Sequence, residues 1–240
     1  LRISGAGADK LIVKRRRVTG PGDQYQKGAQ EQATTLTVHE GPCRFMVKLE
    51  PYLDTGLFLD TRPVRSLIRH VAAGRDFLNL FCYTATASVA AALGGARSTH
   101  AVDLSANYLE WAARNFELNH LSHEQNSLER ADCLSWLQAP AVKRWDLVLL
   151  DAPTFTNSHG RGSQIDLRRD HLHLLQLLSG HLQPGALVIF CTHRRKFRLD
   201  EGIFRLGYTP DQQEDYGNLL PEDFRRTPNA HHCFVLRYLS

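Results

Sequence analysis

The sequence has 240 residues, 42% of them hydrophobic and 22% charged, which is enough to bury the core of one large domain with a smaller one beside it. It contains no apolar stretch near the roughly 18 residues that a membrane-spanning helix needs, and no signal-peptide core, so we expect a cytoplasmic protein without membrane contact. The net charge of +4 is too small to identify a partner by itself, and its distribution says more.

The five cysteines and twelve histidines form no recognisable framework. The cysteines are odd in number and widely spaced, without a C-x-x-C pair, which argues against both disulfides and zinc. His231, His232 and Cys233 are the only tight cluster, and they lie in a predicted strand, where neighbouring side chains face opposite sides. We therefore predict reduced thiols and no metal site.

Residues 1–57 are predicted to form a small β-rich module with a connector, and residues 58–240 the larger domain. Alternating apolar segments separated by Gly and Pro are typical of hairpins. In chain order these segments and turns are Leu11–Val13, Gly20–Asp23, Thr35–Val38, Gly41–Pro42 and Arg44–Leu49.

Strand and helix patterns then alternate to the end of the chain. The predicted strands are Phe77–Phe81, Thr99–Asp103, a short segment before Asp132, Trp145–Asp151 and Ala186–Cys191. The predicted helices are one within Leu53–Arg75, then Ala85–Leu93, Ala106–Leu118 and Asp166–Leu182, the last stopped by Pro184 and Gly185. Such alternation predicts an α/β fold with a doubly wound, mostly parallel seven-stranded sheet of the Rossmann-like type.

In a doubly wound sheet a ligand lies at the carboxyl ends of the strands, so the residues there are the candidates for cofactor binding. Asp103 ends the second strand, about 20 residues after the first strand. A carboxylate at this position accepts hydrogen bonds from both hydroxyls of the cofactor's ribose. Asp132 and Cys133 end the third strand and are assigned to the adenine side. The full predicted set is Asn79, Phe81, Tyr83, Thr84, Asp103, Leu104, Asp132, Cys133 and Asp151.

The turn from Asn79 to Ala87 identifies the kind of cofactor. A nicotinamide dinucleotide needs the motif G-x-G-x-x-G to bring backbone onto its pyrophosphate, and that motif is absent here. A cofactor without phosphate needs no such cradle. The turn therefore favours S-adenosylmethionine over a dinucleotide.

The fourth strand ends in Asp151-Ala152-Pro153-Thr154-Phe155, which would face the methyl group. In methyltransferases that act on planar nitrogens, a similar loop holds the acceptor base with oxygen atoms and stacks an aromatic ring on it. Stacking of a base on Phe155 would contribute about 1–3 kcal/mol. We predict catalytic roles for Asp151, Pro153, Thr154 and Phe155.

Dense basic runs favour nucleic acid as the partner, because clustered positive charge attracts phosphates. Lys14–Arg17 and Arg194–Arg198 are the two longest, and Arg168–Arg169 and Arg225–Arg226 add pairs. The residues assigned to RNA binding are Lys14, Arg15, Arg16, Arg17, Arg194 and Lys196.

Several segments together resemble the C-terminal half of the bifunctional bacterial large-subunit rRNA guanine methyltransferases. They are Tyr52–Asp60, Phe77–Thr84, Leu93–Thr99, Tyr108–Ala112, Ala131–Leu134, Pro153–Ser158, Arg169–Leu172 and Lys196–Arg198. The resemblance covers nearly the whole chain and implies that this half makes 7-methylguanine in 23S rRNA or a large-subunit assembly intermediate. It further implies that the hairpin module helps to grip RNA, and that a separate N-terminal half makes N2-methylguanine.

The chain departs from this family at three places. Ala85 stands where the family has Gly, and a Cβ is costly there if the backbone needs a positive φ. Ala152 replaces the first Pro of the acceptor loop. Cys191–His193 stands where the family is closer to Ser-Asn-Asn.

Three alternatives remain open from the residues alone. A cytosine carbon-5 methyltransferase would use Cys191 as a nucleophile. A catalytically weakened RNA-binding module would keep the fold while Ala85 and Ala152 impair the site. A small-molecule methyltransferase would leave the basic module without a role.

Overall fold

The computed structural model describes residues 35–49, 55–154, 165–194, 196–211, 219–224 and 231–240. Its main sheet has seven strands in the order β5-β4-β3-β6-β7-β9-β8. They are β3 (Asp76–Leu80), β4 (Ser98–Asp103), β5 (Asn126–Arg130), β6 (Trp145–Asp151), β7 (Leu182–Thr192), β8 (Tyr208–Pro210) and β9 (His232–Tyr238). β9 pairs antiparallel with both of its neighbours, β7 and β8, and the other neighbouring pairs of the sheet are parallel. This confirms the predicted doubly wound, mostly parallel sheet.

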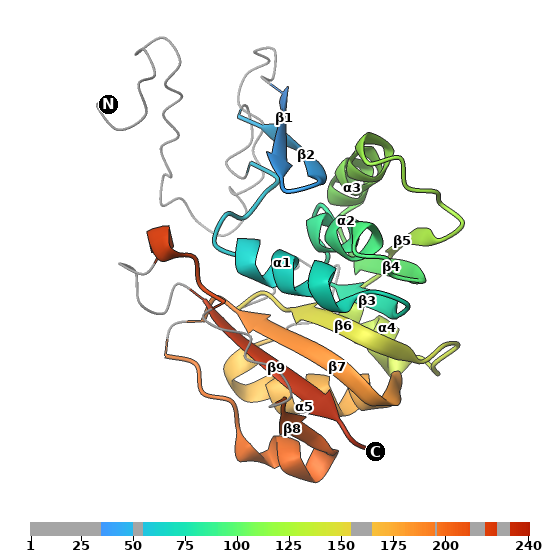
Figure 1. Cartoon of the computed structure of the whole chain (residues 1–240). Coiled ribbons are helices and arrows are strands. Elements are labelled where there is room, and N and C mark those ends of the chain that lie inside the picture. The colour runs from blue at the N-terminus through green and yellow to red at the C-terminus, as the bar shows by residue number, and fades with distance from the viewer. Residues whose placement is uncertain (1–34, 50–54, 155–164, 195, 212–218, 225–230) are drawn as a thin grey trace.

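The helices cover both faces of the sheet (Figure 1). They are α1 (Arg62–Val71), α2 (Thr86–Leu93), α3 (Ala106–Leu118), α4 (Cys133–Gln138) and α5 (Leu167–Ser179), with short 3-10 helices at Glu201–Leu206 and Glu222–Phe224. Leu78 and Val148 pack towards α5, whereas Phe77 and Leu147 pack towards α1 and α2, because side chains alternate along each strand. None of the helices in the described ranges is long and apolar enough to cross a bilayer.

The predicted hairpin is present as β1 (Thr35–Glu40) and β2 (Cys43–Lys48), paired antiparallel around Gly41. Phe45 on its inner face joins the apolar cluster that includes Phe116 of α3. The backbone of Met46 also accepts a hydrogen bond from Trp111 Nε1 at 2.9 Å. The hairpin is therefore tied to α3 by both apolar and polar contacts. The predicted elements at 11–13 and 20–23 lie outside the described residues.

One predicted boundary was wrong and one helix was missed. Helix α5 ends at Ser179 with Gly180 as its C-cap, and β7 begins at Leu182, so Pro184 and Gly185 lie inside a strand. The pairing of β6 with β7 shifts register at this point, and a proline is tolerated in a strand at such an irregularity. Helix α4 escaped prediction because six residues are too few to show a helical period.

The strand order places the switch point between β3 and β6, since the chain moves outward through β4 and β5 and then returns to the other side of β3. Ligands of doubly wound sheets bind outside the carboxyl ends of the strands at this point. The ends of β3, β4 and β6 are therefore where a functional site is expected.

Asp76, at the opposite end of β3, should make stability depend on pH. Burial opposes its ionisation, but hydrogen bonds from Arg97, Lys143 and Ser98 outweigh burial and lower its pKa strongly. Because the folded pKa is lowered, the stabilisation is present above the unfolded pKa near 4 and is lost as pH falls further. We expect Asp76→Asn to cost about 2 kcal/mol at pH 7, with the gap to wild type closing below pH 4 in urea unfolding. A gap that is constant with pH would contradict this account.

Candidate functional site

The loop that follows β3 has an unusual backbone. Phe81, Tyr83 and Ala85 all have left-handed conformations, with φ of 57°, 53° and 53°. Such a conformation costs a non-glycine residue about 1–2 kcal/mol, so surrounding contacts must stabilise the loop. The N–H of Phe81 donates to Cys133 Sγ at 3.3 Å, and the N–H of Tyr83 donates to Asp103 Oδ2 at 2.9 Å. The loop is thus held against the ends of β4 and β5.

The positive φ at Ala85 confirms that this position favours glycine, but we expect the substitution to cost little. In Ala85→Gly, relief of about 1 kcal/mol of strain is offset by greater freedom of the unfolded chain, up to about 1 kcal/mol, and by loss of a buried methyl group worth about 0.8 kcal/mol. Unfolding free energy should therefore change by less than about 1 kcal/mol in urea titration. Ala85→Val should lose more than about 2 kcal/mol, because a branched side chain fits neither the backbone nor the space. Equal stability of the two variants would contradict this.

Asp103 lies at the centre of the predicted cofactor residues. Besides Tyr83, its carboxylate accepts a hydrogen bond from the N–H of Ser105 at 2.9 Å. Burial raises the pKa of Asp103, although the backbone N–H groups of Ser105, Tyr83 and Leu104 favour the charged form. A carboxylate has about four acceptor positions, so Asp103 can also accept from a ligand diol. The neighbouring Leu104 is 38% exposed and offers apolar surface at the same strand end.

Asn79 and Thr84 have their side chains turned inward. The amide of Asn79 donates to Ser88 Oγ at 3.0 Å and joins β3 to α2. The hydroxyl of Thr84 donates to the backbone oxygen of Gly56 at 2.7 Å. Both side chains therefore shape the loop, and any contact they make with a cofactor would come from the backbone.

We call the segment between β2 and α1, described from residue 55 to residue 61, the connector, and its Gly56 is clamped onto the same loop. Its N–H donates to Tyr83 Oη at 3.0 Å. Its φ is +88°, and a Cβ would lie 2.1 Å from the ring of Trp111. Only glycine fits here, so the connector and the loop depend on each other for their conformation.

Asp132 and Cys133 serve α4 and the core. Asp132 Oδ1 caps α4 by accepting hydrogen bonds from the N–H and the hydroxyl of Ser135, both at 2.9 Å. Cys133 is buried, and its sulfur accepts the hydrogen bond from Phe81. The thiol of Cys133 therefore stabilises the loop after β3 from its buried side. A direct contact of either residue with adenine stays a prediction.

The predicted acceptor loop begins at Asp151, the last residue of β6. Asp151 Oδ1 is buried and has no hydrogen-bond partner among the described residues. Burial raises the pKa of Asp151, while the nearby imidazoles of His193 and His231 oppose that rise. Ala152 is packed in the core, Pro153 is exposed and Thr154 is half-buried. Phe155 lies outside the described residues. An unpaired buried carboxylate oxygen is a candidate acceptor for a ligand donor.

Sequence reasoning missed a group of side chains beside Asp151. Asp60 Oδ2 lies 3.6 Å from His193 Nδ1 and 3.5 Å from His231 Nδ1. These residues come from the connector, from the end of β7 and from the start of β9, so no local pattern could have united them. In the parts of the chain that the structure describes, no three His, Cys, Asp or Glu side chains are placed to hold a metal ion.

A row of rings links this group to the loop after β3. Phe58 lies 5.9 Å from His193 and 5.2 Å from Tyr83, between ring centroids, and Tyr83 lies 4.4 Å from Tyr108. Phe58 is 45% exposed, so its ring is available to a planar ligand. The row therefore runs from the predicted cofactor side to the predicted acceptor side.

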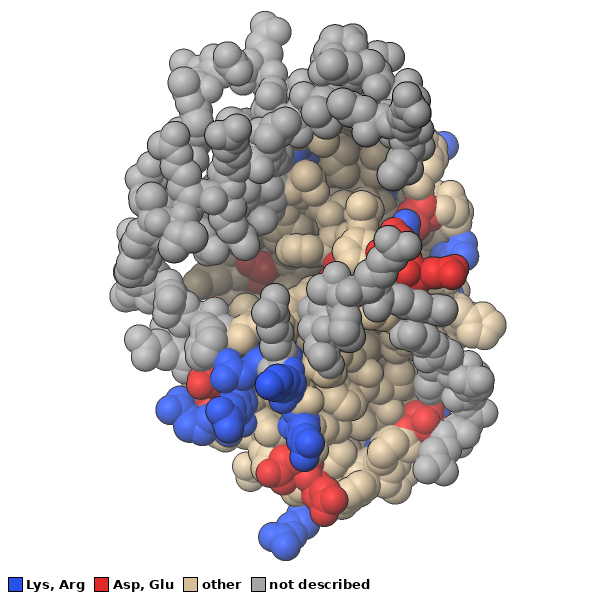
Figure 2. All heavy atoms as spheres, turned by 90° about the vertical axis from the view of Figure 1, so that its left-hand side faces the viewer, with Lys and Arg blue, Asp and Glu red and all other residues tan. Residues whose placement is uncertain are grey.

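Two basic runs that are distant in sequence meet in space. Arg194 Nη1 lies 3.6 Å from Asp166 Oδ1, which brings the segment after β7 to the start of α5. We call the residues Arg168, Arg169, Arg194, Lys196 and Arg198 the basic ridge, and all but the half-buried Arg194 are exposed. Figure 2 shows Lys and Arg side chains gathered on one face of the molecule. Lys14–Arg17 and Arg225–Arg226 lie outside the described residues.

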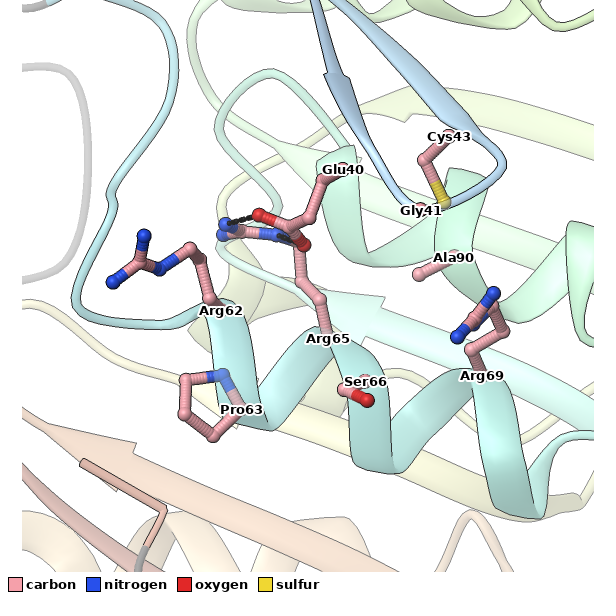
Figure 3. Close-up of a pocket in the computed structure, with 9 residues that line it drawn as sticks. All are labelled: Glu40, Gly41, Cys43, Arg62, Pro63, Arg65, Ser66, Arg69 and Ala90. Carbon is pink, nitrogen blue, oxygen red and sulfur yellow. Dashed lines mark hydrogen bonds and ion pairs between the residues drawn. The ribbon is translucent and has the colours of Figure 1, made fainter. Parts of the chain in front are cut away.

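A separate pocket of about 270 Å³ lies between the hairpin, α1 and α2 (Figure 3). Arg65 crosses it and pairs with Glu40 of the hairpin, through Nε at 2.8 Å and Nη2 at 2.6 Å. Arg62, at the rim, pairs with Asp223. None of the predicted site residues lines this pocket, and we interpret it as the joint between hairpin and sheet.

Cys191 is poorly suited to nucleophilic attack. It is 1% exposed, and its sulfur lies 2.8 Å from that of Cys233 on the neighbouring strand. Burial, followed by the contact with Cys233, raises the pKa of Cys191 well above that of a free thiol. The reactive form of cysteine is the thiolate, so this geometry disfavours the cytosine carbon-5 route.

Comparisons with known proteins show what the chain is similar to. A family model described as S-adenosylmethionine-dependent methyltransferase matches residues 5–201. The chain is 45% identical, over 95% of its length, to ribosomal RNA large subunit methyltransferase K/L of Marinomonas sp. (strain MWYL1), and spans 31% of that protein. The crystal structure of SMU.776, complexed with S-adenosylhomocysteine (SAH), has a TM-score of 0.73 at 28% identity, over 87% of this chain and 57% of that one. A methyltransferase from Streptococcus mutans has a TM-score of 0.71 at 28% identity, over 87% and 56%.

Proposed function

The chain belongs to the S-adenosylmethionine-dependent methyltransferases, and from this we propose that it methylates ring nitrogen 7 of a guanine in 23S rRNA. The observation that carries the RNA part of the proposal is the 45% identity, over 95% of the chain, to an rRNA large subunit methyltransferase. The choice of nitrogen 7 of guanine as the target atom comes from the family resemblance described above. Since the chain spans 31% of that relative, a second catalytic half and its N2-methylguanine activity belong to the proposal as well.

The residues present fit the cofactor. Asp103, with its acceptor positions oriented by two backbone donors, would hold the ribose hydroxyls. Leu104 and Asp132 would lie on the adenine side, and Phe81 and Tyr83 on the methionine side. When bound, S-adenosylmethionine supplies a methyl group carried on a positively charged sulfur.

The acceptor would lie over the end of β6. Nitrogen 7 of guanine carries a free lone pair, so no residue needs to remove a proton. Correct placement of two reactants can provide on the order of 7–11 kcal/mol of the barrier. The unpaired Asp151 Oδ1, the exposed Pro153 and the ring predicted for Phe155 would supply that placement. A flipped guanine costs least in unpaired or distorted RNA.

The basic ridge would contact the phosphates of the same RNA. It lies on α5 and on the segment after β7, and β7 is the strand next to β6 in the sheet. Lys14–Arg17 would add to it from the N-terminal module. Phosphate contacts of this kind give affinity that falls steeply with salt.

One experiment tests the proposal directly. The protein is incubated with protein-free 23S rRNA and methyl-labelled cofactor, and the modified nucleoside is identified by mass spectrometry. Labelled 7-methylguanosine is the expected product. Label in 5-methylcytidine would favour the cytosine alternative. Salt-sensitive RNA binding without any heat from millimolar S-adenosylmethionine in calorimetry would favour the weakened binding module.

A further inference from the structure

Four ionisable side chains meet beside the acceptor loop, and only Asp151 among them has a role in the placement of the acceptor described above. We call Asp60, Asp151, His193 and His231 the Asp60 cluster. The two Nδ1 atoms lie 3.5 and 3.6 Å from the same oxygen of Asp60, which is beyond a good hydrogen bond but well within the range of charge interaction. The His193 side chain is 37% exposed, so the cluster opens to the surface.

The charges of the cluster are unevenly distributed. Burial opposes ionisation of Asp60, but the nearby imidazoles of His231 and His193 outweigh it and lower its pKa. Burial has the larger effect on Asp151, whose pKa is raised. The thiols of Cys191 and Cys233 lie next to the cluster and are also buried or half-buried. Asp60 is therefore the most readily ionised acid of the group.

The proposed reaction creates a positive charge at this place. The lone pair of nitrogen 7 forms the new N–C bond, the electron pair of the broken S–C bond stays on sulfur, and no proton leaves. The purine ring therefore becomes a cation as the methyl group arrives. Groups that are already oriented towards developing charge in a site shielded from water are among the strongest contributors to catalysis.

We propose that the Asp60 cluster supplies a negative charge to the acceptor site. In this proposal Asp60, held between His193 and His231, stabilises the positive charge that develops on the guanine. The inference rests on the proposed function, because methylation at an exocyclic nitrogen or at carbon would leave a neutral base. Asp60 comes from the connector that Gly56 clamps onto the loop after β3. The contacts of Gly56 with the loop after β3 therefore shape the cofactor side and also position Asp60 beside the acceptor site.

The test compares Asp60→Asn and Asp60→Glu with wild type and with Asp223→Asn, which removes an exposed carboxylate that pairs with Arg62 and does not belong to the cluster. For each protein, kcat and KM for 23S rRNA, the Kd of S-adenosylmethionine by calorimetry and the Tm are measured. Asp60→Asn should lower kcat by 10-fold or more, with KM and Kd within about threefold of wild type. Asp60→Glu, which keeps the charge, should recover at least a third of the wild-type kcat, and Asp223→Asn should match wild type.

The outcomes separate the two proposals. If wild type makes a nucleoside other than 7-methylguanosine, the proposed function fails, and the charge argument fails with it. If wild type makes 7-methylguanosine but Asp60→Asn keeps its kcat within twofold, only the present inference is overturned. It is equally overturned if Asp60→Asn and Asp60→Glu lose kcat alike, or if the loss of kcat is matched by a loss in Kd or Tm, because Asp60 would then have a structural role.

Discussion

Asp103→Asn is expected to weaken the binding of S-adenosylmethionine by about 100-fold. Hydrogen bonds to a charged acceptor contribute about 1.5–3 kcal/mol each, and the carboxylate is predicted to accept two from the ribose. An amide keeps one acceptor oxygen for the N–H of Tyr83, so the loop after β3 should stay in place. The remaining atom of the amide is a donor, which faces both the N–H of Ser105 and the ribose hydroxyls less favourably than a carboxylate oxygen does. Calorimetric titration with S-adenosylmethionine gives the affinity directly.

The matched control for this experiment is Glu110→Gln, which removes an exposed carboxylate from the neighbouring helix α3. Its affinity should equal that of wild type. Thermal unfolding without ligand should show Asp103→Asn losing about 1–2 kcal/mol, because the amide cannot accept hydrogen bonds from the N–H groups of both Tyr83 and Ser105. An affinity within fivefold of wild type would remove Asp103 from the cofactor site.

The second large effect is expected at Arg65, which joins the hairpin to the sheet (Figure 3). Its guanidinium is 3% exposed and pairs with Glu40 through two hydrogen bonds. It also donates to the backbone oxygen of Phe58 at 2.9 Å and to Thr61 Oγ1 at 2.7 Å. Removing one partner of a buried pair costs about 3–5 kcal/mol, because the other charge is left without compensation. Arg65→Ala should therefore lose about that much unfolding free energy in urea titration.

Arg62→Ala is the control, since Arg62 is on the same helix and lines the same pocket. Its partner Asp223 is 57% exposed and Arg62 itself 39%, so this pair should contribute less than about 1 kcal/mol. Similar losses of unfolding free energy in Arg65→Ala and Arg62→Ala would contradict the argument that burial makes the Arg65 pair the more stabilising one. Because Arg65 also holds the connector at Phe58, its loss should reduce methyl transfer more than Arg62→Ala does.

The sequence by itself was sufficient for the β/α alternation and for the residues at the strand ends. Apolar runs such as Trp145–Asp151 have a period that depends only on neighbouring residues, and burial on both faces followed from it. The sequence also placed Asp103 at the end of a strand, where a ligand is expected because strand ends in a parallel sheet share one edge. The positive φ at Ala85 was anticipated because the family that the sequence resembles has Gly at this position. The boundary of α5 was not, because Leu182 continues the helical spacing of Leu175 and Leu178 and was counted with the helix, although Gly180 already ends it.

Only the tertiary structure brought together side chains that lie far apart in the chain. Asp60, Asp151, His193 and His231 become neighbours because β6, β7 and β9 are adjacent in the sheet and the connector folds over their ends. The approach of Gly56 to Trp111 and the joining of two basic runs by Asp166 have the same origin. Local periodicity determines which segments are helices and strands, whereas contacts between distant segments depend on sheet order and packing, which no short stretch of sequence encodes.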